Sequence, residues 1–220
     1  MKESEVEILA VENRKIRLEK ELEVSKYNQL SQQIQPHFLF NVLNTLMSLL
    51  RLKKYDELIQ SMEQFIMFLK YKYEIKDHTH LIYNELKHTQ NYLNIQSMRF
   101  GSRLHTNIEV DEKLLGESII PYLIQTLVEN TFKHGFDAEM EVCQIKISLY
   151  RETDDICLIV EDNGRGIDTE VQYNTGLSNI ETRLNLLYGK HAELKILPRA
   201  VGSGVKVFCR WNPSNMQELK

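Results

Sequence analysis

The chain has 220 residues, of which 42% are hydrophobic and 26% charged, and its formal net charge is −4. This length allows one large domain or two smaller ones, and the slightly acidic balance gives no electrostatic reason to expect nucleic-acid binding. No apolar run approaches the roughly 20 residues that span a bilayer, and the charged first residues carry no signal peptide. We therefore expect a soluble chain, in which Cys143, Cys157 and Cys209 are reduced core residues because they form no CxxC pair.

Residues 1 to about 77 are predicted to be almost entirely helical, because they contain no glycine and only one proline, Pro36. Residues 6–34 are rich in Glu, Lys and Leu, with apolar residues on a seam of alternating three and four spacing. Asn13 and Lys20 are among the polar residues that interrupt the seam. A weak coiled coil is expected over residues 1–34, and a single solvated helix is the open alternative.

The stretch 35–41, QPHFLFN, sets Pro36 beside His37 inside the predicted helix. Proline in a helix interior removes one backbone hydrogen bond and costs about 3 kcal/mol. It also frees the carbonyl of Gln32, so the helix can bend there. We therefore expect a bend next to a potential nucleophile, His37, through which motion in residues 1–35 changes access to that histidine.

The spacing after Pro36 predicts a two-helix hairpin over residues 35–77. Its first helix has an apolar ridge of Leu39, Leu43, Leu46 and Leu50, widened by Phe40, Met47 and Leu49. Its polar residues recur at intervals of four and three on the opposite stripe, namely His37, Asn41, Asn44, Ser48 and Arg51. His37 should therefore face solvent or a docking partner. A second amphipathic helix is predicted over 56–76, and such hairpins often dimerise into four-helix bundles.

Residues 78–215 change to mixed helices and hairpin-linked strands. Strands are expected at 78–83, 104–110, 143–151, 156–161, 193–197 and 205–211, and helices at 84–100, 121–134 and 177–188. Asn84 is the predicted N-cap of its helix, and Gly101 should end that helix. The pattern predicts the α+β class, with helices layered on one face of a sheet, and residues 216–220 form a tail. His78, His80, His88, His105 and His191 show no metal-ligand spacing and are expected on the surface.

Three segments of this second region carry residues suited to nucleotide binding. In the helix after Pro121, Asn130 offers an oxygen ligand for a hard cation and Lys133 offers a charge for phosphate. Asp162 ends an apolar strand, and Gly164 and Gly166 permit positive φ and a close approach of backbone to ligand. The helix that opens at about Gly176 presents free N–H groups. Taken singly, a solvated polar stripe, a tight turn and an ordinary helix start explain these features equally well.

Their order along one compact region resembles the nucleotide boxes of the gyrase, Hsp90, histidine kinase and MutL (GHKL, or Bergerat) ATP-binding fold. With the stretch 35–41 upstream, the chain resembles a LytS/YesM-type sensor histidine kinase over roughly residues 30–212. The stretches 93–96 (LNIQ), 129–135 (ENTFKHG) and 183–189 (RLNLLYG) carry much of this resemblance. It implies an α+β protein with a dimerisation hairpin followed by an ATP-binding domain.

The resemblance implies that His37 accepts a phosphoryl group from ATP and passes it to a response-regulator receiver domain. Asn130 would bind Mg²⁺, Lys133 and His134 would lie near the phosphates, and Asp162 would recognise adenine. The remaining implied ligand residues are Gly164, Gly166, Gly176, Leu177 and Asn179, with a lid over 167–175. The implied assembly is a homodimer in the cytoplasm, without direct nucleic-acid binding, attached to a bacterial membrane only through a sensor region absent from this chain.

The sequence departs from the pattern of related histidine kinases at two positions, and two other functions remain open. Asn174 stands where many relatives have glycine, although asparagine tolerates left-handed backbone better than most residues. Phe38 stands where many other histidine kinases, but not this type, carry a carboxylate, and Asn41 could orient the His37 ring without acting as a base. A GHKL-type ATP hydrolase normally needs glutamate at the position of Thr126. The other alternative is a catalytically silent nucleotide-binding dimeric scaffold.

Overall fold

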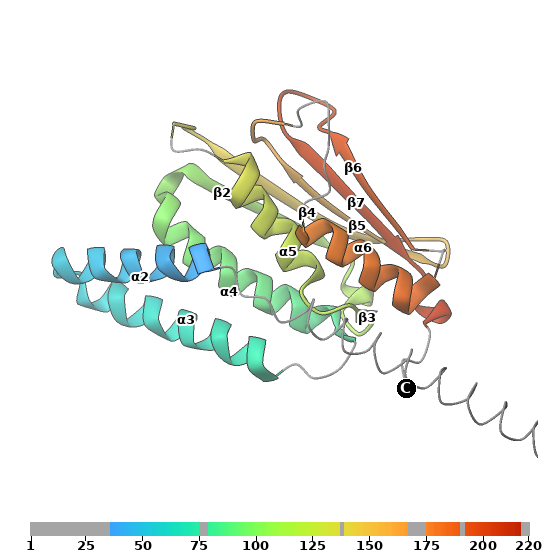
Figure 1. Ribbon diagram of the computed structural model, residues 1–220, viewed down its shortest axis with the longest axis horizontal. Coiled ribbons are helices and arrows are strands. Elements are labelled where there is room, and N and C mark those ends of the chain that lie inside the picture. Colours follow the sequence, from blue (N-terminus) through green and yellow to red (C-terminus); the bar gives the residue numbers. More distant parts are fainter. Residues whose placement is uncertain (1–35, 75–78, 137–138, 167–174, 190–191, 217–220) are drawn as a thin grey trace, which may run out of the picture.

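Two helices joined by a short turn form a hairpin in the computed structural model, which describes residues 36–74, 79–136, 139–166, 175–189 and 192–216 (Figure 1). They are α2 (Pro36–Arg51) and α3 (Tyr55–Glu74). Lys53 takes a left-handed backbone with φ 59°, which reverses the chain within the turn. The predicted hairpin is therefore present. The coiled coil expected over 1–34 and the bend expected before Pro36 lie outside the described residues.

A five-stranded sheet forms the second part of the fold. Its strands are β2 (Leu104–Val110), β4 (Cys143–Glu152), β5 (Asp155–Asp162), β6 (Glu193–Pro198) and β7 (Val205–Trp211), in the order β2-β4-β5-β7-β6. The β2–β4 pair is parallel and the other pairs are antiparallel. In β4, Cys143, Ile145, Ile147 and Leu149 are buried while the residues between them lie outward, as expected for a sheet with one covered face.

Three helices cover that face: α4 (Ile82–Phe100), α5 (Leu123–Asn130) and α6 (Thr175–Tyr188) (Figure 1). The hairpin lies on the far side of α4 from the sheet, so the chain is layered as hairpin, helices and sheet. Two short strands, β1 (His80–Leu81) and β3 (Ser118–Ile119), pair near the start of α4. The predicted α+β class with helices on one sheet face is confirmed.

The predicted strands at 104–110 and 205–211 are found as β2 and β7, and Gly101 ends α4 with φ 61°. Asn84 is not the N-cap of α4, because the helix begins two residues earlier, after Leu81. The N–H groups of Ile82 and Tyr83 bond instead to the carbonyls of Glu117 and Leu115. The segment just before β3 supplies these acceptors, so the side chain of Asn84 is not needed as a cap.

The predicted buried face of α2 was partly wrong. Phe38 and Val42 are the deeply buried residues of this helix, at 6% and 5% exposed, because this stripe packs against α3 and α4. Leu39 and Leu46 are partly buried beside it, whereas Leu43 and Leu50 remain 50% and 46% exposed. The helix therefore has two apolar faces, and the described residues cover only one of them.

The expectation that His80 and His88 are surface residues was also wrong. His88 is fully buried and stacks against Tyr71 and Phe68, with ring centroids 3.9 and 5.0 Å apart. His80 is partly buried and donates through Nε2 to Glu85 at 2.8 Å, while its Nδ1 lies 2.9 Å from the Tyr71 hydroxyl. His80 thus links the buried Glu85 carboxylate to the Tyr71 hydroxyl of α3.

Glu85 is a fully buried carboxylate that joins three elements of the fold. Besides His80 of β1, it accepts the backbone N–H groups of Tyr122 at 2.9 Å and Gln125 at 3.3 Å, at the start of α5. Burial raises the pKa of Glu85, but the hydrogen bond and charge of His80 outweigh burial and hold it below its usual value of 4.5. Tyr122 needs this support because its backbone is left-handed, with φ 62°.

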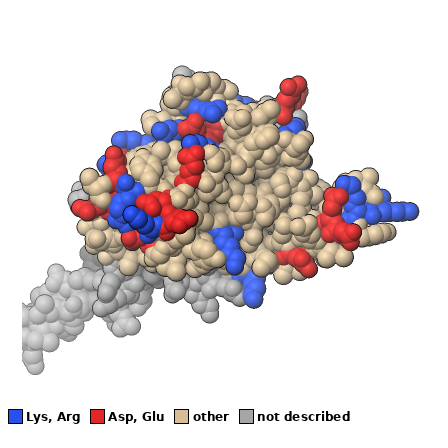
Figure 2. Space-filling model, turned by 180° about the vertical axis from the view of Figure 1, so that it is seen from behind, with Lys and Arg blue, Asp and Glu red and all other residues tan. Residues whose placement is uncertain are grey.

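The surface mixes charges of both signs, and Figure 2 shows basic and acidic side chains side by side on the face that it presents. The outer face of the sheet carries ion pairs such as Arg199–Glu161 at 2.8 Å. All three cysteines are buried and free, as predicted. Within the described ranges, no helix combines the length and apolar character needed to cross a bilayer.

Candidate nucleotide site

Asp162 is the centre of the candidate site, at the end of β5 and 6% exposed. Its Oδ1 accepts the backbone N–H groups of Gly164 at 2.9 Å and Val205 at 3.2 Å. Its Oδ2 accepts the hydroxyl of Thr131 at 3.1 Å. A carboxylate offers about four lone-pair sites, so Oδ2 has one left after these three bonds, and it suits an amino group of a ligand.

The pKa of Asp162 is raised above its usual value of 3.8 because burial disfavours the charged carboxylate. The bonds from Gly164, Val205 and Thr131 and the charge of Arg199 offset this effect only in part. The fold therefore holds this carboxylate at some cost in free energy rather than drawing stability from its charge. Such a perturbed group at the end of a strand is typical of a functional site.

Glycines allow the backbone to close around Asp162. A Cβ on Gly164 would lie 2.5 Å from Cα of Gly135, and a Cβ on Gly204 would lie 1.9 Å from the carbonyl oxygen of Asp162. Gly204 also has φ 129° and Gly166 has φ 87°, backbone conformations that L side chains rarely adopt. The turn after β5 thus packs directly on the loop that follows α5, and Arg165 N donates to Gly135 O at 3.0 Å.

The end of α5 carries the predicted phosphate-side residues. The helix is regular only to Asn130 and continues as a π-turn over Thr131–Gly135, so the predicted helix over 121–134 is too long. This turn faces Thr131 inward to Asp162 and leaves Lys133 and His134 exposed, with Asn130 half-buried. Desolvation by neighbouring atoms and the charge of Lys133 lower the pKa of His134 below its usual value of 6.5, which favours the neutral ring at pH 7.

The start of α6 contains the other predicted ligand residues. Gly176 and Asn179 are half-buried, whereas Leu177 is 7% exposed and belongs to the hydrophobic core. Leu177 therefore anchors the helix start in the core. The predicted lid, except for Thr175, lies outside the described residues, and Asn174 lies there too.

His37 belongs to the first turn of α2, and its side chain lies outside the described residues. Its predicted exposure therefore remains a prediction. Asn41, one turn further on, is half-buried, while Asn44, Ser48 and Arg51 of the same predicted stripe are exposed. Asn41 thus lies at the border between the covered and the solvent-facing sides of α2.

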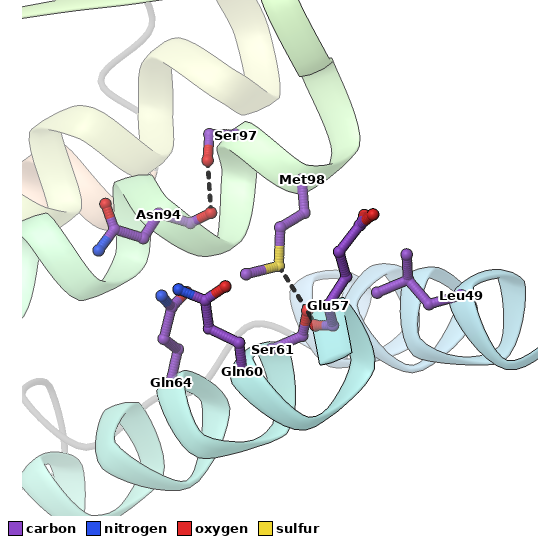
Figure 3. A pocket seen from close by; sticks show the side chains of 8 residues that line it. All are labelled: Leu49, Glu57, Gln60, Ser61, Gln64, Asn94, Ser97 and Met98. Carbon is purple, nitrogen blue, oxygen red and sulfur yellow. Dashed lines mark hydrogen bonds between the residues drawn. The ribbon is translucent and has the colours of Figure 1, made fainter. Parts of the chain in front are cut away.

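A cavity of about 480 Å³ lies between the hairpin and α4 (Figure 3). Gln60, Ser61 and Gln64 of α3 line one side, and Asn94, Ser97 and Met98 of α4 line the other. None of the predicted ligand residues is among the lining residues. We therefore regard this cavity as a gap in the packing between hairpin and α4, and not as the nucleotide site.

The structure thus brings Asp162, Gly164 and Gly166 together with the loop that follows Asn130. Three partners of Asp162 were missed in the sequence: Thr131, Gly204 and Val205. Gly202-Ser203-Gly204 indicates a turn before the last strand. Because this turn is about 40 residues from Asp162 in the sequence, however, its contact with Asp162 could not be predicted. Thr131 could have been noticed because it directly follows Asn130. Among the described residues, no cluster of three or more His, Cys, Asp or Glu side chains could hold a metal.

Comparison with known proteins matches residues 25–104 to the family model described as "Histidine kinase". The chain is 33% identical over 204 residues to "Sensor histidine kinase/phosphatase LytS" of Staphylococcus aureus strain MRSA252. The same identity and coverage hold for the LytS protein of strain Mu50. In both cases the match covers 86% of this chain and 34% of the relative, so the chain spans about a third of the length of the curated relatives it matches.

Among solved structures, the chain is similar to the histidine kinase domain of the Erythrobacter litoralis EL346 blue-light activated histidine kinase. The TM-score is 0.51 at 14% sequence identity, covering 89% of this chain and 94% of that chain. At this identity the likeness concerns the fold alone. It supports the arrangement of a helical region followed by helices on a sheet.

Proposed function

We propose that this chain, which belongs with the LytS-type sensor histidine kinases, is the catalytic region of a two-component sensor kinase. In this proposal it autophosphorylates His37 from ATP and passes the phosphoryl group to a response regulator. The observation that carries the proposal is Asp162, a buried carboxylate with one open lone pair, enclosed by glycines beside the loop after Asn130. This site shares one chain with the histidine segment matched by the family model.

In the nucleotide site, Oδ2 of Asp162 would accept the exocyclic amino group of adenine. The backbone turn at Gly164 and Gly166, held against the backbone of Gly135, would pass close to the base. Lys133 and neutral His134, both exposed, would contact the phosphates. Gly176, Leu177 and Asn179 would form the helix start behind them, with Leu177 holding the helix in place from the core.

The residues present also fit Mg²⁺. This ion prefers oxygen ligands and usually keeps waters and substrate phosphates beside one or two protein groups. Asn130 offers one side-chain carbonyl oxygen at the end of α5, and it is half-buried beside the exposed Lys133. Mg²⁺ would supply charge neutralisation at the phosphates, which is a large part of catalysis in phosphoryl transfer.

At His37, a neutral imidazole nitrogen would attack the γ-phosphorus and displace ADP. The unperturbed pKa of histidine, about 6.5, leaves the ring mostly neutral at pH 7. The attacking nitrogen then carries a lone pair and no proton, so no base is required before the attack. Asn41, one helical turn on, would accept the N–H of the other ring nitrogen and orient the ring, which suits a site where Phe38 replaces a carboxylate.

The proposed domain organisation has four parts: a coiled-coil signalling helix (1–34), a dimerisation and phosphotransfer hairpin (35–77), an ATP-binding domain (78–215) and a tail (216–220). The phosphoryl group would pass to an aspartate of a receiver domain. Because ATP is the donor, the reaction belongs in the cytoplasm. Attachment to the membrane would run through a sensor region outside this sequence.

The apolar face of the hairpin that the described part of the chain leaves exposed supports a homodimer. Large apolar side chains on α2 and α3 are 46–66% exposed along this face, and exposed apolar patches mark interaction sites. They are Phe40, Leu43, Met47 and Leu50 on α2 and Ile59, Met62 and Ile66 on α3. Their spacing of three and four residues is that of a four-helix bundle seam.

Leu43→Glu is expected to convert the dimer to a monomer, since two charges would face each other in the bundle. Light scattering after size-exclusion chromatography measures the mass of wild type and variant. The matched control is Asn44→Glu, next along α2 but outside the seam, which should leave the dimer intact. A monomeric wild type, or a dimeric Leu43→Glu variant, would contradict the proposed interface.

The proposed function is tested by incubating the chain with γ-labelled ATP and Mg²⁺. We expect wild type to acquire acid-labile label and His37→Gln to acquire none. His105→Gln, which removes a histidine on the exposed edge of the sheet, serves as control and should label normally. Label in His37→Gln at the wild-type level would eliminate the assignment. Tight nucleotide binding without any label in wild type would instead favour the silent scaffold.

A further inference from the structure

Phe38, the residue directly after His37, is part of an aromatic contact between the hairpin and the rest of the chain. Its ring lies 4.9 Å from that of Phe68 on α3 and 5.0 Å from that of Tyr92 on α4, centroid to centroid. It is only 6% exposed. The position where many other histidine kinases have a carboxylate is therefore occupied here by a side chain packed against a neighbouring helix.

Tyr92 carries this contact onward to the nucleotide loop. Its ring lies 5.8 Å from that of Phe132, in a T-shaped arrangement. Phe132 belongs to the π-turn between Asn130 and Lys133, and it packs further against Phe100 and Phe136. The residue beside the phospho-acceptor and the loop beside the phosphates are thus linked by one intervening ring.

The middle of this bridge is fixed in place. Tyr92 is 2% exposed, and its hydroxyl accepts a hydrogen bond from Nε2 of Gln96 at 2.8 Å. Aromatic pairs at these separations contribute beyond their buried area and prefer particular orientations. By contrast, the cavity lined by Gln60, Gln64 and Asn94 leaves the same interface loosely filled nearer the hairpin turn. The rings therefore form a closely packed part of the contact between the hairpin and α4.

We infer that Phe38 and Tyr92 are positioning residues for phosphoryl transfer. The inference rests on the proposed function. Through Phe132, the two side chains fix the position of the first turn of α2, which carries His37, relative to the loop beside the phosphates. Neither residue touches the reacting atoms. Their effect arises because transfer requires an in-line geometry, and a displacement of about 1 Å can cost about 100-fold in rate.

The test separates binding from transfer. Tyr92→Leu and Phe38→Leu keep an apolar side chain but remove a ring, and each is expected to lower the labelling rate at saturating ATP at least about ten-fold. The affinity for ADP, measured by calorimetry, should not change, because neither residue lies in the nucleotide site. Tyr92→Phe keeps the ring and should be labelled at the wild-type rate. The double Leu variant should be no slower than the slower single variant, since both break one bridge.

The control is Tyr83→Leu, an aromatic residue of the same α4 helix that is 52% exposed, which should label at the wild-type rate. If Tyr92→Leu misfolded and lost its affinity for ADP, the labelling rate of Phe38→Leu, a change on the hairpin, would decide the test. Normal or faster labelling by both ring-free variants, with ADP affinity intact, would overturn the inference while leaving the proposed function standing. Absence of label in wild type would instead reject the proposed function.

Discussion

Replacing Asp162 by asparagine is expected to weaken ADP binding at least about ten-fold while the protein stays folded. Asparagine Oδ1 can still accept from Gly164 and Val205, and its amide can donate to Thr131. The amide then stands where Oδ2 now has an open lone pair, so it would oppose the adenine amino group donor to donor. Losing a hydrogen bond to a charged group costs about 1.5–3 kcal/mol. Calorimetric titration with ADP measures the change.

The fold should tolerate this change, because burial already disfavours the charge of Asp162 and raises its pKa. Thermal melting of the variant should match or exceed that of wild type at pH 7. The matched control is Asp155→Asn at the opposite end of β5, which should bind ADP normally. Unchanged ADP affinity in Asp162→Asn would mean that the adenine site lies elsewhere.

Glu85→Ala is expected to lower the free energy of unfolding by about 3–5 kcal/mol, the cost of removing one partner from a buried ion pair. The change would leave His80 and the N–H groups of Tyr122 and Gln125 without their acceptor. It would also release the left-handed backbone at Tyr122 that begins α5. Urea unfolding followed by circular dichroism measures the loss.

The pH dependence of this effect has a definite sign. Since the folded pKa of Glu85 is below 4.5, its stabilisation is fully present above pH 4.5 and is lost as the pH falls through the folded value. The difference in the free energy of unfolding between wild type and Glu85→Ala should therefore become smaller as the pH is lowered. Glu109→Ala, which breaks an exposed ion pair with Lys146, is the control and should unfold like wild type. A Glu85→Ala variant of wild-type stability would show that the buried carboxylate does not hold α5.

The sheet and the turn after β5 were predictable because their signals are local. Alternation in β2 and β7 and the glycines after Asp162 each act within a few residues. Asn84 was predicted as a cap for the same local reason, and it failed because the acceptors of the first N–H groups come from Leu115 and Glu117, some 30 residues away. Local capping signals cannot anticipate a backbone partner brought in by the fold.

The two faces of α2 illustrate a second limit. Periodicity identifies apolar residues, but it cannot say which of two apolar faces packs within the chain. The burial of Phe38 and Val42 was not predicted, because the leucines form the more regular apolar ridge in the sequence. His80 and His88 were predicted to lie at the surface. Their burial depends on partners such as Glu85 and Tyr71 from other elements, and the spacing of residues in the sequence does not reveal these contacts.

Mapping the phosphoryl group by tandem mass spectrometry at alkaline pH, after incubation with ATP and Mg²⁺, tests the account most directly. The chain contains seven histidines, and we predict modification of His37 alone in wild type and a greatly reduced amount in Asp162→Asn. Phosphate on a different residue, or equal phosphorylation of His37 when Asp162 is asparagine, would contradict transfer from this site to this histidine.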